Sequence, residues 1–135
     1  MFRLVSERGP GPEFAGSWRI TWTEVWDSEA LDLVSPAYIQ FGDDGLGEFG
    51  MIALRGWLDC RNGLRDGRPS VEFSWAGQDD GDDAGGRGWA VVEPDGSPRG
   101  WLFIHCGDDS EFRATRAEIL MPSKRTGTRR RPAMR

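Results

Sequence analysis

Few residues of this chain carry obvious chemistry, and His105 is the first of them. It is the single histidine, and histidine is the side chain that titrates near neutral pH, so His105 is the natural general base of any enzyme built here. Its neighbour Cys106 points to the opposite face of a strand, which prevents the two from pairing as base and nucleophile. Cys60 stays open as a partner from elsewhere in the fold. The alternative, which we favour, is that the side chains of residues 108–110 accept hydrogen bonds from the backbone amides of their own turn, and that His105 is a half-buried side chain at the rim of a barrel.

Metal chemistry has weak support in the sequence. Residues 79–83 hold four aspartates around one glycine, and Ca²⁺ takes about 6–8 oxygen ligands. An EF-hand loop that began at Asp80 would have Ala84 at its fifth position and Val91 at its twelfth, so the pattern fails. The two cysteines and His105 do not complete the four ligands of a zinc site without a carboxylate. We therefore expect a solvated acidic turn, no metal and no cofactor.

Aromatic and cationic side chains give the best indication of a ligand site. Alternation along the expected strands places Trp18, Trp22, Trp75, Trp89 and Trp101 on inward faces. Such indoles either fill a core or line a pocket for an apolar or planar ligand or a sugar. Arg87 lies between two glycines and is expected to pair with Asp82, Asp83 or Asp109, or otherwise to contact a ligand. The candidate ligand-binding residues at the barrel mouth are Trp22, Trp75, Trp89, Trp101, His105 and Arg87.

The elements that must position these residues are strands. Glycine (19) and proline (8) are abundant among the 135 residues, and both disfavour helices. Apolar and polar residues alternate in short segments that are separated by Gly and Asp-Gly turn signals. We predict an all-β fold, a small antiparallel barrel of about seven or eight strands with one short helix at 29–33, and a β-sandwich is the alternative. The expected strands are 18–24, 37–41, 47–59, 70–76, 88–93, 99–106 and 111–117, with a polar connection at 61–69 and a long loop at 77–88.

Length and charge define the organisation of the chain. We expect one domain: a flexible N-terminal arm (1–15), the barrel (16–120) and a basic disordered tail (121–135). Residues 121–135 carry six cations and no acid, whereas residues 16–120 carry a net charge of −11. The acidic body disfavours nucleic acid apart from weak contacts by the tail. No signal peptide or apolar run long enough to cross a membrane is present, which predicts a cytoplasmic protein with reduced cysteines.

Five segments within residues 16–117 carry recognisable motifs: 22–27, 32–34, 71–75, 86–90 and 107–114. Together they resemble an uncharacterised, mostly bacterial family of short all-β proteins that has no established activity. Separately, Gly-x-Trp at 16–18 is similar to the start of the first strand in lipocalin- and avidin-type barrels. That second resemblance implies a basic residue of the last strand, Arg113 or Arg116, beside Trp18.

Three classes of function remain open on this sequence. The first is a non-enzymatic binding module that holds a small molecule or peptide at an aromatic-lined barrel mouth. The second is an acidic interaction protein of immunity-like or regulatory type, and the third is an enzyme that uses His105 as its base. The sequence contains no phosphate-binding loop, dinucleotide-binding glycine pattern or paired metal motif, which leaves the binding module as our expectation.

Overall fold

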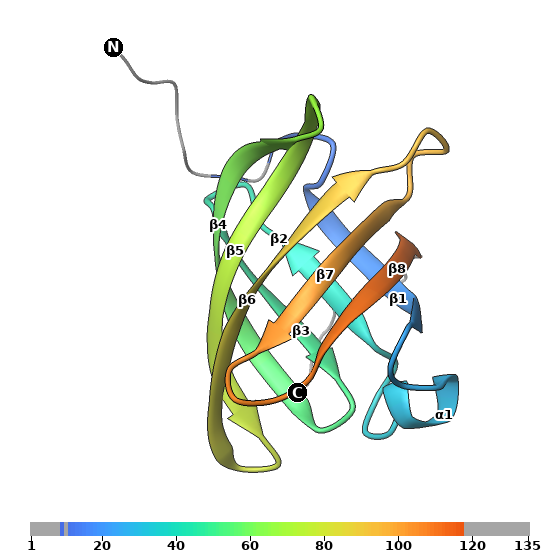
Figure 1. The fold of residues 1–135 in the computed structure, drawn as a ribbon, viewed down its shortest axis with the longest axis vertical. Coiled ribbons are helices and arrows are strands. Elements are labelled where there is room, and N and C mark those ends of the chain that lie inside the picture. Colours follow the sequence, from blue (N-terminus) through green and yellow to red (C-terminus); the bar gives the residue numbers. More distant parts are fainter. Residues whose placement is uncertain (1–8, 10, 118–135) are drawn as a thin grey trace, which may run out of the picture.

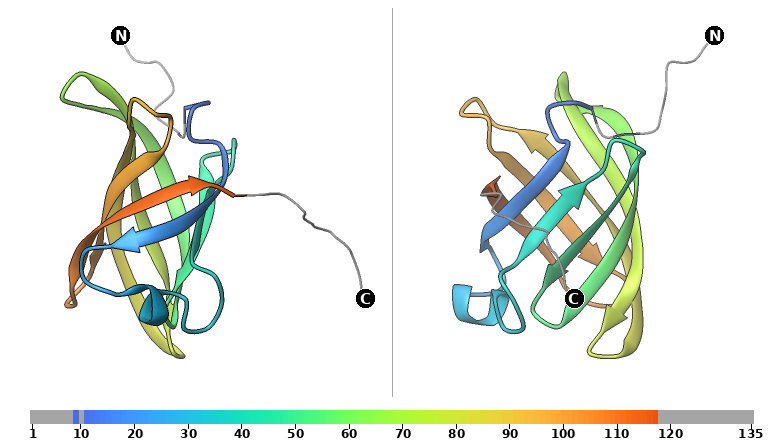
Figure 2. Two further views of the ribbon diagram at one scale, coloured as in Figure 1. Left: turned by 90° about the vertical axis from the view of Figure 1, so that its right-hand side faces the viewer. Right: turned by 180° about the vertical axis from the view of Figure 1, so that it is seen from behind.

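The protein is one closed barrel of eight antiparallel strands, in a computed structural model that describes residue 9 and residues 11–117. Each strand pairs with the next along the chain and β8 closes the barrel on β1, which confirms the predicted barrel over the sandwich (Figures 1 and 2). The elements are β1 (Gly16–Thr23), α1 (Ser28–Leu31), β2 (Tyr38–Phe41), β3 (Leu46–Met51), β4 (Leu54–Arg65), β5 (Arg68–Asp79), β6 (Asp82–Val92), β7 (Pro98–Ile104) and β8 (Asp109–Arg116).

Two long hairpins replace the predicted polar connection (61–69) and acidic loop (77–88), so both of those predictions are wrong. β4 and β5 pair along their full length to a turn at Asp66-Gly67, and β5 and β6 do the same to a turn at Asp80-Gly81. All four turn residues have positive φ, of 51°, 77°, 51° and 91° in chain order. Asp-Gly suits such two-residue hairpin turns. The polar and glycine-rich segments are therefore the ends of long, solvent-facing strands.

The predicted strand over 47–59 is also wrong, because the chain turns back at Ile52 and Ala53. β3 ends at Met51 and β4 begins at Leu54, and these two residues are paired. Ile52 adopts a positive φ of 57°, which is uncommon for a β-branched residue. Its N–H donates to the carbonyl of Leu31 at 2.8 Å. The turn thus depends on a contact with the end of α1, which the local sequence does not reveal.

The N-terminal segment closes one end of the barrel. Phe14 is fully buried and meets Phe41 edge-on, with 6.2 Å between ring centroids. Its carbonyl accepts a hydrogen bond of 2.8 Å from the indole N–H of Trp18. Phe14, which is expected in the flexible N-terminal arm, is therefore part of the packed core, whereas Pro12 and Glu13 before it are exposed. Residues 1–8 and 10, with the basic tail (121–135), lie outside the described residues.

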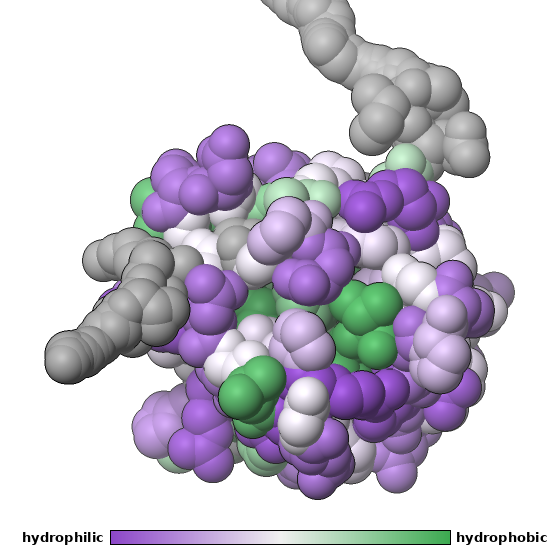
Figure 3. All heavy atoms as spheres, turned by 90° about the horizontal axis from the view of Figure 1, so that it is seen from above, coloured by the Kyte–Doolittle hydropathy of each residue, from purple (hydrophilic) through white to green (hydrophobic). Residues whose placement is uncertain are grey.

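Seen from above, hydrophilic residues cover most of the described surface and hydrophobic ones gather near the centre (Figure 3).

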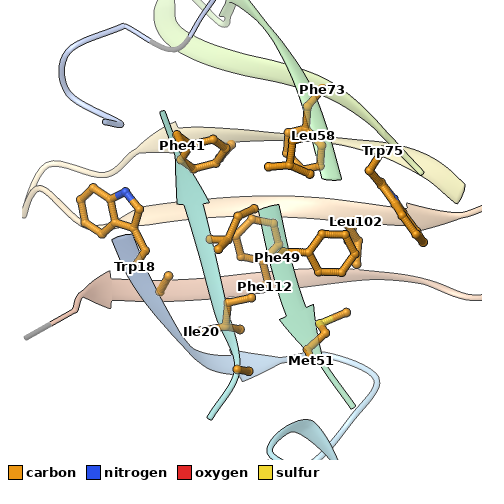
Figure 4. Close-up of a cluster of buried hydrophobic side chains, with 14 of the residues drawn as sticks. Trp18, Ile20, Phe41, Phe49, Met51, Leu58, Phe73, Trp75, Leu102 and Phe112 are labelled. Carbon is orange, nitrogen blue, oxygen red and sulfur yellow. The ribbon is translucent and has the colours of Figure 1, made fainter. Parts of the chain in front are cut away.

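Large aromatic rings fill the barrel interior (Figure 4). The rings of Phe49 and Trp75 pack edge-to-face with 4.9 Å between their centroids. Glycines at the paired positions of the neighbouring strands make room for them: a Cβ on Gly88 would lie 2.5 Å from the Phe73 ring, and one on Gly100 would lie 2.7 Å from Phe112. The interior is consequently a packed core of large rings set against small residues, as expected for a barrel of eight strands.

A hydrogen-bonded ion pair fixes the connection between β1 and β2. The Arg19 guanidinium donates to both carboxylate oxygens of Asp32, at 3.0 and 2.6 Å, and also to the carbonyl of Ala37 at 3.0 Å. Asp32 accepts in turn from the Ala37 N–H at 2.9 Å. The bond from Arg19, followed by that from Ala37, lowers the pKa of Asp32 below its ordinary value of 3.8.

We expect Asp32→Ala to lower the free energy of unfolding by about 1 kcal/mol at neutral pH, since all three hydrogen bonds to this partly exposed carboxylate, two from Arg19 and one from Ala37, are lost. A carboxylate with a lowered pKa stabilises the fold above its unfolded pKa and loses that contribution as it is protonated. The difference in the free energy of unfolding between Asp32→Ala and wild type, measured by urea unfolding, should therefore become smaller as the pH falls from about 5 to about 2. A difference that stays constant over this range would contradict the ion-pair account.

Candidate ligand-binding groove on the outer sheet face

The tryptophans divide between the interior and the outer surface. Trp18 and Trp75 face inward and are only 2% and 4% exposed. Trp22 is 43% exposed, and Trp89 and Trp101 are half-buried on the outer face. The prediction that all five indoles face inward is thus wrong for Trp22, Trp89 and Trp101. An aromatic-lined site at the barrel mouth is not assembled by these residues.

A β-bulge turns Trp22 outward. Ile20 of β1 pairs with Ala114 of β8, but Trp22 pairs with Arg113, so Thr21 is an extra residue in β1. A bulge shifts the inward–outward alternation by one residue. Thr23 is therefore buried in place of Trp22, and the guanidinium of Arg113 lies 5.3 Å from the Trp22 ring centroid.

Trp89 and Trp101 face outward because the smaller residues beside them face the core. They are direct cross-strand partners on β6 and β7. Gly88 and Ala90 flank Trp89 along β6, and Gly100 precedes Trp101 along β7. All three small residues are buried, and the two glycines leave space for aromatic rings from neighbouring strands. Where both faces of a strand are apolar, alternation shows which residues share a face but not which face is inside.

The strand register places two rows of side chains side by side on the outer face of β4–β7. The first row runs across the strands as Asp59, Ser74, Arg87 and Phe103, and the second as Arg61, Glu72, Trp89 and Trp101. Between them lies a groove of about 620 Å³, whose lining residues are Asp59, Arg61, Arg65, Glu72, Phe73, Ser74, Arg87, Gly88, Trp89 and Phe103. This volume is within the usual range for small-molecule sites.

Two of the three groove arginines are held by carboxylates. Arg61 forms an ion pair with Asp59. Arg65 donates to both oxygens of Glu72, at 2.9 and 3.0 Å. Its guanidinium also lies 4.1 Å from the centroid of the Trp89 ring. These bonds hold the two guanidinium groups along one wall of the groove. Each arginine–carboxylate pair is neutral overall.

Arg87 is the exception among the groove arginines. It forms no ion pair with any residue that the structure describes, and the predicted salt bridge to Asp82, Asp83 or Asp109 is therefore not observed. Its guanidinium lies 4.9 Å from the Phe103 ring centroid and its side chain is exposed. Ser74 lies directly opposite on β5 and is also exposed. Among the described residues, the Ser74 hydroxyl has no hydrogen-bond partner, so two free donors face one groove.

The remaining predicted site residues lie elsewhere. Trp75 is in the core, where its indole N–H donates to the Phe103 carbonyl at 3.1 Å. His105 is exposed in the turn between β7 and β8, and its backbone N–H donates to the Gly85 carbonyl at 2.7 Å. Of the predicted set, only Arg87 and Trp89 line the groove, with Trp101 beside them.

No arrangement for cysteine or metal chemistry is found in the described part of the chain. Cys60 is buried and Cys106 is exposed, and both are free thiols. Burial raises the pKa of Cys60 to about 12, which keeps it protonated and poorly nucleophilic. Residues 9 and 11–117 contain no group of three or more His, Cys, Asp or Glu side chains that could hold a metal ion. The partnership of Cys60 with His105 that the sequence leaves open does not form, because Cys60 faces the interior and His105 the solvent.

Comparisons with family models, curated proteins and solved structures find no match for this chain. The similarities seen in the sequence therefore remain predictions. Of the two arginines implied by the Gly-x-Trp resemblance, Arg116 is the one beside Trp18, with 3.8 Å from guanidinium to ring centroid. None of the described helices has the length and apolar character to span a membrane.

Six groove-lining side chains were not predicted as a site from the sequence: Asp59, Arg61, Arg65, Glu72, Ser74 and Phe103. Asp59 and Phe103 are 44 positions apart in the numbering and meet only through the pairing of four strands. The available signal was the pair of Asp-Gly turns at 66–67 and 80–81. A two-residue hairpin turn fixes the register of the strands that it joins.

Proposed function

We propose that this protein is a non-enzymatic binding module whose ligand lies in the outer groove rather than inside the barrel. The ligand class is a small molecule with an anionic group and a planar apolar part. The observation that supports this proposal most strongly is Arg87, a cation without a carboxylate partner among the described residues, in a groove walled by aromatic rings.

Charge and hydrogen bonding favour an anion at Arg87. The groove holds three arginines against two carboxylates, a local charge of +1 on a body that is strongly acidic. An oxyanion in front of Arg87 would accept bonds from its guanidinium and from the Ser74 hydroxyl. Asp59 and Glu72 do not cancel this preference, because Arg61 and Arg65 bind them.

The aromatic walls favour a planar group next to that anion. Phe103 lies under the Arg87 guanidinium, and Trp89 forms the wall in the neighbouring row. A flat apolar ring placed between them would bury its surface against both side chains. His105, the general base expected from the sequence, does not line the groove, and the carboxylates that do, Asp59 and Glu72, are paired with Arg61 and Arg65. This arrangement supports binding without chemistry.

We expect Arg87→Ala to weaken the binding of 2-naphthoate, a planar carboxylate used as a probe, by about tenfold or more. A charge-assisted hydrogen bond contributes about 1.5–3 kcal/mol, and about 1.4 kcal/mol is a tenfold change in Kd. Ser74→Ala should weaken it by a smaller factor. Isothermal titration calorimetry of wild type and variants measures both effects.

The matched control is Arg113→Ala, which removes another exposed arginine stacked on an aromatic ring, Trp22, outside the groove. It should leave the Kd of 2-naphthoate within about twofold of wild type. The neutral analogue 2-naphthamide should bind wild type and Arg87→Ala equally weakly. Equal losses of naphthoate affinity in the two arginine variants would refute the groove as the site.

A further inference from the structure

A second surface, independent of the groove, lies at the barrel end that carries α1. It contains an apolar hollow of about 190 Å³ between the segment that follows α1 and the turn between β3 and β4. The apolar side chains in its lining are those of Val34, Met51, Ile52, Ala53 and Leu54. The hollow is small and suits one side chain of a partner rather than a free metabolite.

Backbone hydrogen bonds join three connections into this one surface. The Ile52 N–H donates to the Leu31 carbonyl at 2.8 Å, which ties the β3–β4 turn to α1. The Asp80 N–H donates to the Ala53 carbonyl at 3.0 Å, which ties the β5–β6 turn to the same place. Figure 1 shows α1 and the turns after β3 and β5 at the same end of the barrel. The three connections therefore lie together at one end of the barrel.

Large apolar side chains are left exposed on this face. Leu33 is 65% exposed and Val34 is 73% exposed, although the helix before them buries Leu31 completely. Single exposed apolar residues are ordinary, but a group of them beside a hollow is typical of an interaction site.

The rim of the hollow on the side of the β5–β6 turn is acidic. Asp79, Asp80, Asp82 and Asp83 are all exposed, and none of them forms an ion pair with a described residue. Asp80 lines the hollow itself. The cation that lines it, Arg55, is bound to Glu48 at 3.1 Å. An apolar hollow that Asp80 lines, with three more exposed carboxylates in the same β5–β6 hairpin, is complementary to a partner that carries apolar and cationic side chains together.

We infer that this face docks a basic peptide segment of another protein. One apolar side chain of the segment would enter the hollow beside Val34, and flanking Lys or Arg side chains would face Asp79–Asp83. The apolar contact supplies affinity, and the complementary charge supplies orientation and speed of association.

The test uses a fluorescein-labelled synthetic peptide of alternating leucine and lysine, with binding followed by fluorescence anisotropy on the full chain. We expect Leu33→Ser with Val34→Ser to raise the Kd about tenfold, and Asp82→Asn with Asp83→Asn to do the same. A peptide with serine in place of leucine should bind at least about tenfold more weakly, because the anchor is lost.

Matched double variants separate this site from general attraction to an acidic protein. Asp43→Asn with Asp66→Asn changes the net charge equally, and Leu46→Ser with Leu64→Ser removes leucines that are 52% and 74% exposed elsewhere. Both control pairs should change the Kd less than about twofold. The inference is overturned if the control aspartate pair weakens binding as much as the Asp82 and Asp83 pair, or the control leucine pair as much as the Leu33 and Val34 pair. It is also overturned if the Leu33 and Val34 pair or the Asp82 and Asp83 pair binds the peptide like wild type.

Discussion

Trp75→Ala is expected to lower the free energy of unfolding by about 3–5 kcal/mol, because it removes a large ring from a packed core. Trp75 is 4% exposed, and its ring meets Phe49 edge-to-face. The substitution also leaves the Phe103 carbonyl without the indole N–H that it accepts at 3.1 Å. Urea unfolding followed by circular dichroism measures the loss.

Trp57→Ala is the matched control for this prediction. Trp57 belongs to β4, which pairs with β5, but its side chain is on the outer face and 53% exposed. Its removal should cost less than about 1 kcal/mol. A Trp75→Ala protein as stable as the Trp57→Ala protein would mean that Trp75 lines a cavity open to ligands. That result would favour a ligand site at the barrel mouth over the outer groove.

Gly56→Val is expected to be the second most destabilising change, lowering the free energy of unfolding by about 1–3 kcal/mol or more. A Cβ on Gly56 would lie 2.7 Å from the Trp75 ring and closer still to the ring of Phe49. Two aromatic rings cannot both move aside in a closed barrel without disturbing the strands that carry them. The midpoint of urea unfolding should therefore fall clearly.

Ala76→Val provides the comparison, since it adds bulk at an exposed strand position on the neighbouring β5. Valine also has a higher strand propensity than alanine, so this variant should be as stable as wild type or slightly more so. If Gly56→Val were equally well tolerated, the interior would have free space, contrary to the packing described here.

The sequence predicts the fold class because alternation and turn chemistry are local properties. Strands β5 and β8 have clear alternation, as does β1 up to Ile20. The short helix is also a local property, because the Asp27 side chain caps it by accepting the Ala30 N–H at 2.9 Å. The turn at Ile52 escapes prediction, because it depends on the Leu31 carbonyl from another element. The buried position of Phe14 escapes it for the same reason.

The candidate site is less accessible from the sequence than the fold. The sequence predicts Arg87 and Trp89 as ligand-binding residues, but it places them at an aromatic-lined barrel mouth, whereas both line a groove on the outer face. A bulge decides whether Trp22 faces inward or outward. Whether Trp89 and Trp101 face inward or outward depends on which residues the core can accommodate. Both properties follow from the register of the closed barrel and not from any single strand.

The most direct test of the outer groove is a titration of ¹⁵N-labelled protein with 2-naphthoate, observed through the indole N–H signals of its seven tryptophans. We predict that the Trp89 signal moves with the ligand concentration while the signal of Trp18, in the core, stays in place. Movement of the Trp18 signal with an unchanged Trp89 signal would place the ligand inside the barrel and contradict the account.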